Sequence, residues 1–229
     1  RKANVIAVIS RGRGNPFFAR LIKIIEPELN EHGYEMSVHH IDTSDDELKA
    51  AALLEREKRL KGIIFLGGRF NYHADDIAAI KVPFVCCSYT NVFGALEEGS
   101  YSSVAIDDKK AARQAVEYLL QKGHKRIAAL IEHTGGGSIS QLRYEGYVGA
   151  LQDAGLALDA SLVGCAGSFE MDDAYAAASR LIAEAKPTAL FAISDLMGVA
   201  AMKAATDAGL RVPDDLSIIA IDGIEFSNY

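Results

Sequence analysis

Three side chains in this sequence have the chemistry to hold a small polar molecule, and each is expected where a predicted strand ends: Phe17, Arg143 and Asp222. An arginine offers N–H donors, whereas an aspartate offers carboxylate oxygens as acceptors. The face of a phenylalanine ring stacks on a sugar ring or a planar base. We find no nucleophile–base set and no carboxylate pair suited to catalysis, so the three residues predict ligand binding.

Arg143 is in phase with the apolar stripe of its predicted helix. The residues of this stripe come three, four, seven, eight and eleven positions after Arg143 in the sequence. They are Gly146, Tyr147, Ala150, Leu151 and Ala154. A guanidinium in such a position is costly to desolvate unless it meets acceptors. A ligand hydroxyl, carboxylate or carbonyl would supply them, and so would a structural aspartate. The alternative is an arginine whose stem packs while its head reaches water.

Two aspartates also follow predicted strands. Asp222 comes after the apolar run Ile218–Ile221, where a carboxylate is well placed to accept hydrogen bonds from ligand hydroxyls. Asp195 comes after the run Phe191–Ser194 in a similar position. Because an aspartate just before a helix satisfies the free N–H groups of its first turn, we predict that Asp195 caps the following helix.

The aromatic pair Phe17 and Phe18 follows Pro16, which suits the first turn of a helix that opens where the first strand ends. Phe18 begins an apolar stripe that we predict to be core, and the stripe continues with Leu21, Ile25 and Leu29. Phe17 is one step off this stripe and is expected to project into a binding cleft. A second core aromatic is the alternative.

Phe169 lies in the loop after the predicted strand that ends at Cys165. It would either close the pocket opposite Phe17 or pack locally. The glycines at 135–137, followed by Ser138, precede the helix of Arg143. Glycine-rich backbone before a helix binds anions, which would suit a phosphorylated effector, but we favour a flexible loop at the cleft.

Signatures of enzymes and cofactor sites are missing from the sequence. Neither G-x-S-x-G nor G-x-x-x-x-G-K-[ST] occurs, and the stretch from Gly12 resembles a dinucleotide loop but has Phe17 where a glycine belongs. His39-His40 lacks the spacing of a helical metal site, and the acids at 45–47 are typical of a helix start. We therefore predict no enzymatic activity, no cofactor and no metal site.

The elements that position these residues alternate regularly between strand and helix. Apolar runs of strand length occur at Val5–Ser10, Met36–Ile41, Gly62–Leu66, Val82–Cys87, Ser103–Ile106, Arg126–Ile131, Leu162–Cys165, Ala189–Ile193 and Leu216–Ile221. Several are apolar at consecutive positions, as in parallel strands covered on both faces. Amphipathic helical patterns lie between most of them. The sequence therefore predicts the α/β class, with Rossmann-like parallel sheets and right-handed crossovers.

The alternation of predicted strands and helices is interrupted once, at Ser88–Ser102, where no helix pattern separates two strands. Two successive strands suggest that the chain leaves one sheet and starts another, so we predict an N-terminal lobe over 1–107 and a C-terminal lobe over 108–229. Ligands of parallel α/β folds bind outside the carboxyl ends of the strands. With two such lobes, the expected ligand site is the cleft between them.

Composition excludes several classes of protein. The 229-residue chain has a net charge of −7 and only weak basic clusters, so by itself it should not bind DNA well. No apolar run approaches the ~18 residues of a membrane span, and the N-terminus lacks a signal-peptide pattern. Three cysteines, two of them adjacent, argue against a disulfide framework and favour a reducing compartment such as the cytoplasm.

Several ordered motifs resemble the lactose/galactose-repressor (LacI/GalR) family of transcription regulators, whose core has the periplasmic-binding-protein fold of type I. The resemblance runs from Ile6 to Tyr229. It rests on Ile6–Ile9 with Asn15–Phe18, Lys61–Phe65, Val82–Val85, Gly123–Ala128, Arg143–Tyr147, Pro187–Ala192, Ser194–Met197 and Gly209–Ile219. The segment Gly123–Ala128 is closer to the regulators than to the transport proteins.

The resemblance implies an N-terminal helix-turn-helix headpiece, with Arg1-Lys2 as a remnant of the hinge, and operator binding as a homodimer. It implies a small-molecule effector, a sugar or a related metabolite, whose binding changes operator affinity. By resemblance the ligand-binding residues would be Phe17, Phe18, Arg143 and Asp222, with Ser194, Phe169 and Ser88 as further candidates.

This sequence departs from the family pattern at three points. Ser194 stands where an asparagine is usual, and Ser88 and Tyr89 occupy a strand end where sugar binders often place an acid. The polar set for a simple pyranose is thus depleted. The chain also stops before the family's last crossovers, so the C-terminal part of both lobes is expected to be missing.

The alternative function is a periplasmic sugar-binding component of an importer, because both classes share this fold. A headpiece of about 60 residues encoded upstream would support the regulator, whereas a signal peptide would support the importer. An exposed apolar surface suited to dimerisation would also favour the regulator.

Overall fold

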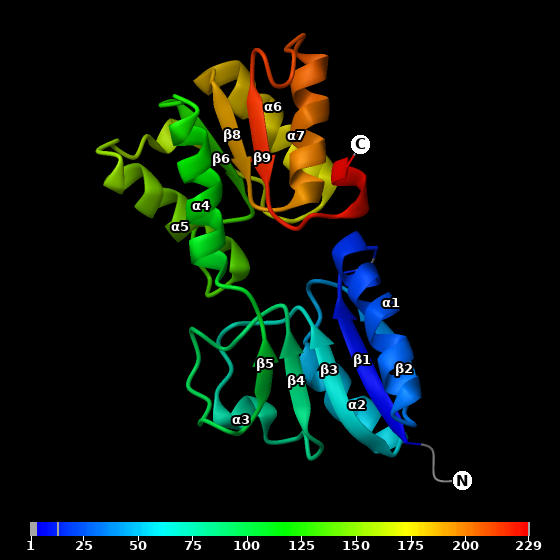
Figure 1. Ribbon diagram of the computed structural model, residues 1–229. Helices are drawn as coiled ribbons and strands as arrows, with labels where there is room; N and C mark the ends of the chain where they lie inside the picture. The colour runs from blue at the N-terminus through cyan, green and yellow to red at the C-terminus, as the bar shows by residue number, and fades with distance from the viewer. Residues whose placement is uncertain (1–3, 13, 229) are drawn as a thin grey trace. The chain divides into compact units, whose positions relative to one another are not determined.

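A computed structural model describes residues 4–12 and 14–228 of the protein (Figure 1). Two compact units make up the chain, Arg1–Ile106 and Asp107–Tyr229. Each unit has its own parallel sheet, and we describe each by itself. The hinge remnant expected at Arg1-Lys2 lies outside the described residues.

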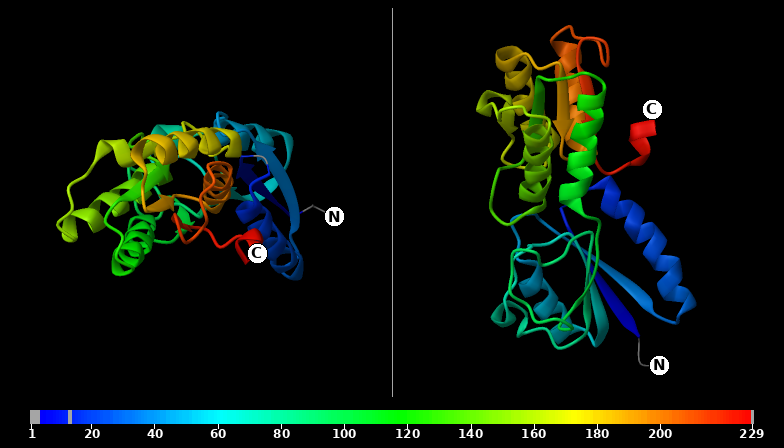
Figure 2. Two further views of the ribbon diagram at one scale, coloured as in Figure 1. Left: turned by 90° about the horizontal axis from the view of Figure 1, so that it is seen from above. Right: turned by 60° about the vertical axis from the view of Figure 1, so that its left-hand side comes forward.

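The first unit has a five-stranded parallel sheet in the order β2-β1-β3-β4-β5. Its strands are β1 (Val5–Arg11), β2 (Glu35–Ile41), β3 (Leu60–Leu66), β4 (Phe84–Cys87) and β5 (Ser102–Val104), and its helices are α1 (Pro16–Glu31), α2 (Glu47–Glu57) and α3 (Ala74–Ile77). The crossover by α1 runs from β1 to β2 and the crossover by α2 runs back past β1 to β3. Right-handed crossovers in opposite directions place α1 and α2 on opposite faces of the sheet (Figures 1 and 2).

The second unit has a four-stranded parallel sheet in the order β7-β6-β8-β9. Its strands are β6 (Ile127–Ile131), β7 (Val163–Cys165), β8 (Ala189–Ala192) and β9 (Ser217–Ala220), and its α-helices are α4 (Asp108–Gln121), α5 (Ile139–Asp153), α6 (Met171–Arg180) and α7 (Asp195–Asp207). A π-helical turn, η2 (Leu181–Ala185), continues α6, and two short 3-10 turns are η1 (Ala160–Leu162) and η3 (Glu225–Asn228). Helices α4 and α5 pack together, as do α6 and α7.

The consecutive apolar runs of the sequence are the central strands of the second unit. All residues of β6 and β8 are buried. Because helices cover both faces of this sheet, side chains pointing to either face lie in the core. The prediction of an α/β fold with parallel sheets is confirmed.

Two predictions about individual elements need correction. The strand after the Ser88–Ser102 stretch does not begin a new sheet, because β5 pairs with β4 and Cys86 lies opposite Ser103. The second sheet begins with β6. The predicted core stripe of α1 is only half-buried, from Phe18 to Leu29, and no residue of α1 is fully buried. This helix contacts β1 and β2 at the edge of its sheet, so only part of its apolar face is covered.

A close approach of α4 and α5 depends on Gly146. A Cβ atom at this position would lie 2.8 Å from the Ala112 Cβ and 3.0 Å from the Arg113 backbone nitrogen. Gly146→Ala is therefore expected to lower the free energy of unfolding by about 1–3 kcal/mol, because the helices must separate. Urea unfolding measures the loss.

Gly149, one turn further along α5, provides the matched control for that substitution. A Cβ there meets only the Arg113 Nη1, at 3.6 Å. Gly149→Ala is expected to stabilise the protein by about 0.5–1 kcal/mol, since alanine restricts the unfolded chain. Equal effects of the two substitutions would contradict the close approach.

Candidate functional site

The guanidinium of Arg143 is the centre of a buried polar cluster at the carboxyl edge of the second unit's sheet. Its side chain is 7% exposed, so the head does not reach water freely. Nε donates to the Asp108 Oδ1 at 2.9 Å, and Nη2 lies 2.9 Å from the same oxygen. Nη1 donates to the carbonyl oxygen of Ile193 and lies 3.4 Å from the Asp222 Oδ1. The in-phase position of Arg143 thus places it among acceptors that the protein itself supplies.

Asp222 follows β9 with a φ of +139°, a backbone conformation that side chains rarely adopt. Its carboxylate is weakly satisfied: among the described residues, the donors to it are Arg143 and the Asp195 backbone N–H, both at 3.4 Å. Burial raises the pKa of Asp222 to about 6, although the nearby Arg143 charge opposes this shift. A partly buried carboxylate with two long contacts retains capacity to accept hydrogen bonds from a ligand.

The capping prediction for Asp195 is wrong. Ser194 is the N-cap of α7, and its Oγ accepts from the Met197 N–H at 3.3 Å. Asp195 is the first helical residue, and its carboxylate accepts from the Ile224 N–H at 2.8 Å. The cap falls one residue earlier because the short serine side chain already satisfies the first turn. Ser194 is 8% exposed, and its hydroxyl oxygen caps α7. This structural role is separate from the ligand role predicted for it.

Asp108 belongs to the same cluster and was not predicted from the sequence. It is 4% exposed, and burial raises its pKa while Arg143 opposes the shift. Asp107, the residue before it, caps α4 through its bond to the Lys110 N–H. The same order occurs at α2, where Asp46 caps the helix and Glu47 is buried, and at α7 with Ser194 and Asp195. A capping residue followed by an acid is therefore the sequence signal for these buried carboxylates.

The remaining candidates of the second unit lie in loops at the carboxyl ends of β6 and β7. Phe169 is half-buried and packs against the hydrophobic core, which is the local use considered above. In the glycine-rich loop, the Gly137 N–H donates to the Gln141 Oε1 at 3.0 Å, and the His133 N–H donates to the Ser140 Oγ at 3.1 Å. Side chains of α5 thus fix this loop and engage two of its backbone donors.

The candidates of the first unit line the carboxyl edge of its own sheet. Phe17 and Phe18 are half-buried neighbours with ring centroids 5.7 Å apart. The ring of Phe18 lies against Gly67 after β3, where an added Cβ would be 2.8 Å from the Phe18 Cζ. Ser88 follows β4 with a φ of +73° and donates its N–H to the Val104 carbonyl at 2.8 Å. The first unit therefore offers an aromatic and hydroxyl surface here.

Glu47 forms a second buried cluster, in the first unit. Its side chain is fully buried; Oε1 accepts from the Arg69 N–H at 2.9 Å and from the Tyr72 hydroxyl, and Oε2 lies 3.5 Å from the Arg11 Nη1. Burial raises the pKa of Tyr72, and Glu47 adds to the shift. One carboxylate thus holds together the ends of β1 and β3. From the sequence, Glu47 was expected only to be one of the acidic residues at the start of a helix.

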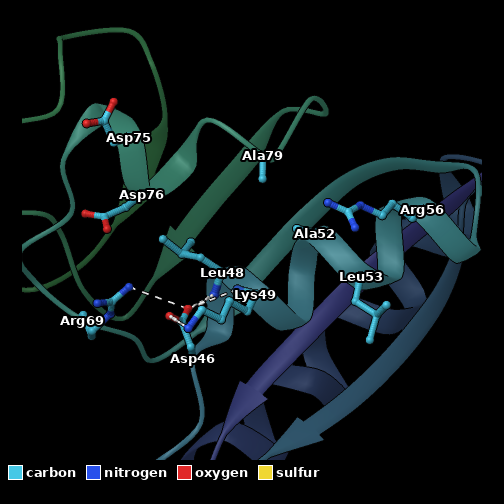
Figure 3. Close-up of a pocket in the computed structure, with 10 residues that line it drawn as sticks. All are labelled: Asp46, Leu48, Lys49, Ala52, Leu53, Arg56, Arg69, Asp75, Asp76 and Ala79. Carbon is cyan, nitrogen blue, oxygen red and sulfur yellow. Dashed lines mark hydrogen bonds and ion pairs between the residues drawn. The ribbon is translucent and has the colours of Figure 1, made fainter.

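A surface pocket of about 430 Å³ lies between α2 and α3 of the first unit (Figure 3). None of the predicted ligand residues lines it. Its lining includes three cations and three acids, Lys49, Arg56, Arg69, Asp46, Asp75 and Asp76. Arg69 and Lys49 both lie within 4 Å of the Asp46 carboxylate. The lining thus has as many positive as negative side chains.

None of the helices in the described part of the chain combines the length and hydropathy of a bilayer-spanning segment. Over the same residues, no three histidine, cysteine or acidic side chains are grouped to hold a metal ion.

Comparison with known proteins gives a consistent result. The family model for "Periplasmic binding proteins and sugar binding domain of LacI family" matches residues 3–226. The transcriptional regulator MalR of Clostridium butyricum is 37% identical over 227 residues, which cover 98% of this chain and 67% of MalR. The repressor CytR of Escherichia coli K12 is 31% identical over 229 residues, 100% of this chain and 65% of CytR. The chain thus spans about two thirds of the length of these relatives.

Solved structures show the same likeness. A complex of the transcriptional regulator CelR with cellobiose has a TM-score of 0.82 at 26% identity, over 100% of this chain and 70% of that one. A LacI-family regulator of Lactobacillus casei with bound sucrose has a TM-score of 0.80 at 25% identity, over 98% of this chain and 81% of that one.

Proposed function

The chain belongs to the family of periplasmic binding proteins and sugar-binding domains of LacI regulators, and from this premise we propose that it is the effector-binding core of a bacterial transcription regulator. The effector would be a sugar or a related metabolite. A headpiece outside this chain would bind operator DNA, and effector binding would change its affinity. The expected coupling between the two sites is about 1–3 kcal/mol.

The observation that carries this proposal is the Arg143–Asp222 cluster. A buried guanidinium and a weakly satisfied carboxylate lie together at the carboxyl edge of a parallel sheet, where α/β proteins bind ligands. We propose Arg143, Asp222 and Ser194 as ligand contacts from the second unit, and Phe17, Phe18 and Ser88 from the first. Phe169 would contribute the aromatic surface of the second unit.

The relatives and solved structures described above are regulators, so the importer alternative is not favoured. In keeping with this class, we propose that the whole protein acts in the cytoplasm, as a homodimer, and without enzymatic activity. The net charge of −7 supports placing DNA contact outside this chain, because phosphate binding requires a basic surface.

A thermal-shift screen tests the proposal. The probes are neutral sugars, beginning with cellobiose and sucrose, followed by nucleosides, purines and sugar phosphates. A ligand at one hundred times its Kd adds about 2.7 kcal/mol to the stability of the folded state, which raises the melting temperature by roughly 5–10 °C for a chain of this size. At least one class should produce a saturable shift of this kind. The absence of any shift across all four classes would contradict the proposed function.

A further inference from the structure

The surface pocket between α2 and α3 is separate from the residues proposed to bind the effector, none of which lines it. Its volume of about 430 Å³ is within the range of small-molecule sites, which is roughly 300–1,000 Å³. One wall is α2 and its N-cap, and the other is α3 with the turn that follows it. All of these elements belong to the first unit, so the pocket is complete within that unit.

Most of the charged groups that line the pocket already have partners in the protein. The Asp46 carboxylate caps α2 by accepting from the Lys49 N–H at 3.1 Å, and the Arg69 Nη2 lies 3.7 Å from it. On the opposite wall, the Asp76 carboxylate accepts from the His73 N–H at 2.7 Å. These groups therefore have a structural use at the starts of α2 and α3.

Arg56 and Asp75 are different, because both are exposed and neither side chain has a hydrogen bond or ion pair with any described residue. Figure 3 shows Arg56 on α2 and Asp75 on α3, at opposite ends of the pocket. The guanidinium has five N–H donors, and the carboxylate has two acceptor oxygens. The pocket thus has a free cation at one end and a free anion at the other.

Apolar side chains complete the lining. They are Leu48, Ala52, Leu53 and Ala79, and Leu53 is 55% exposed. A chain of methylene groups lying over them would remove apolar surface from water. At the acidic end, Asp76 adds a second carboxylate next to Asp75, and an ammonium group has three N–H donors to share between two acids.

We propose that this pocket is an accessory site for a linear zwitterion, whose carboxylate contacts Arg56 and whose ammonium contacts Asp75. An apolar chain joins the two groups. Molecules with this chemistry are ω-amino acids and short peptides with free termini. A simple anion or a simple cation would leave one end of the pocket without a partner. The inference goes beyond the proposed function and does not depend on it.

The test uses the whole chain labelled with ¹⁵N, in which the backbone amide resonances of Leu53 and Ala79 report binding. The probes are two zwitterions, ε-aminocaproate and trialanine. Hexanoate and hexylamine are the counterparts of ε-aminocaproate that lack the ammonium or the carboxylate. At equal ionic strength, at least one zwitterion should shift both resonances saturably. Each counterpart should bind at least about threefold more weakly than ε-aminocaproate, because it lacks one ion pair at an exposed site.

Two substitutions test the ends of the site separately. In Arg56→Gln, the affinity for ε-aminocaproate should fall to about that of hexylamine, since only the ammonium contact remains. In Asp75→Asn, it should fall to about that of hexanoate. Arg59→Gln is the matched control, because Arg59 is exposed near the end of α2 but does not line the pocket, and it should keep the wild-type affinity. All three variants should fold, since each changes an exposed side chain.

Three results would overturn the inference. The first is the absence of a saturable shift with either zwitterion. The second is an equal affinity for ε-aminocaproate, hexanoate and hexylamine, which would mean that only the apolar lining takes part. The third is an equal loss of affinity in Arg56→Gln and Arg59→Gln, which would indicate a general attraction to the positive charge of this surface.

Discussion

Asp222→Asn is expected to stabilise the unliganded protein above pH 6 while weakening effector binding. The pKa of Asp222 is raised from 3.8 to about 6 by burial, so its ionised form costs the folded state about 3 kcal/mol at roughly 1.4 kcal/mol per unit. The neutral amide avoids this cost. Because it cannot replace a charge-assisted hydrogen bond, effector affinity should fall by roughly 10- to 100-fold.

The sign of the pH dependence follows from proton binding. Below pH 3.8 the carboxyl is protonated in both the folded and the unfolded chain, so it contributes no difference. Between 3.8 and about 6 the folded state binds more protons, and the stability of the wild type falls as the pH rises through this interval. The advantage of Asp222→Asn should therefore grow from near zero to about 3 kcal/mol over that range and stay constant above it.

Urea unfolding of both proteins across this range measures the difference. Asp172→Asn, at an exposed position in the first turn of α6, gives the baseline for losing one carboxylate and should stay within about 0.5 kcal/mol of the wild type. A variant that is less stable than the wild type above pH 6, or whose difference does not change with pH, would show that Asp222 is not strained by burial.

Arg143→Ala is expected to have the opposite effect on stability, with a loss of about 3–5 kcal/mol near neutral pH. The substitution leaves Asp108 and Asp222 buried without their counter-ion, and it removes the hydrogen bond that Arg143 donates to the Ile193 carbonyl. Effector binding should be abolished. The loss of stability should shrink in acid, because protonation of the two carboxyls removes the unpaired charge.

Arg143→Lys is the companion variant. It retains the positive charge but not the planar fork, so it should recover much of the stability while effector affinity stays low. Urea unfolding gives the first quantity, and titration calorimetry with a probe from the thermal-shift screen gives the second. If Arg143→Ala has the stability and affinity of the wild type, the guanidinium neither neutralises the acids nor contacts the effector.

The strands and the burial of Arg143 could be predicted because each depends on a local pattern. Runs such as Ile127–Ile131 are apolar at consecutive positions only when both faces are covered, which also specifies a parallel sheet. Arg143 is in phase with Gly146, Tyr147 and Ala150, and these face the core in the structure. Arg143 shares this face and is buried with it.

The partners of Arg143 could be predicted only in part, because they depend on contacts between distant segments. Asp108 lies 35 positions before Arg143, and nothing near either residue specifies the pair. Glu47 reaches Arg69 and Tyr72 over similar distances along the chain. The half-burial of α1 was missed for a related reason: an amphipathic pattern gives the direction of an apolar face but not how much of it is covered.

Arg143 joins three segments of the second unit through its contacts with Asp108, Ile193 and Asp222. Its rigid, planar head ties the loop after β9 to the end of β8 and, through Asp108, to the opening turn of α4. That turn comes directly after Ile106, where the chain passes from one unit to the other. Because the guanidinium contacts both aspartates, a displacement of Asp222 is expected to move the opening turn of α4 as well.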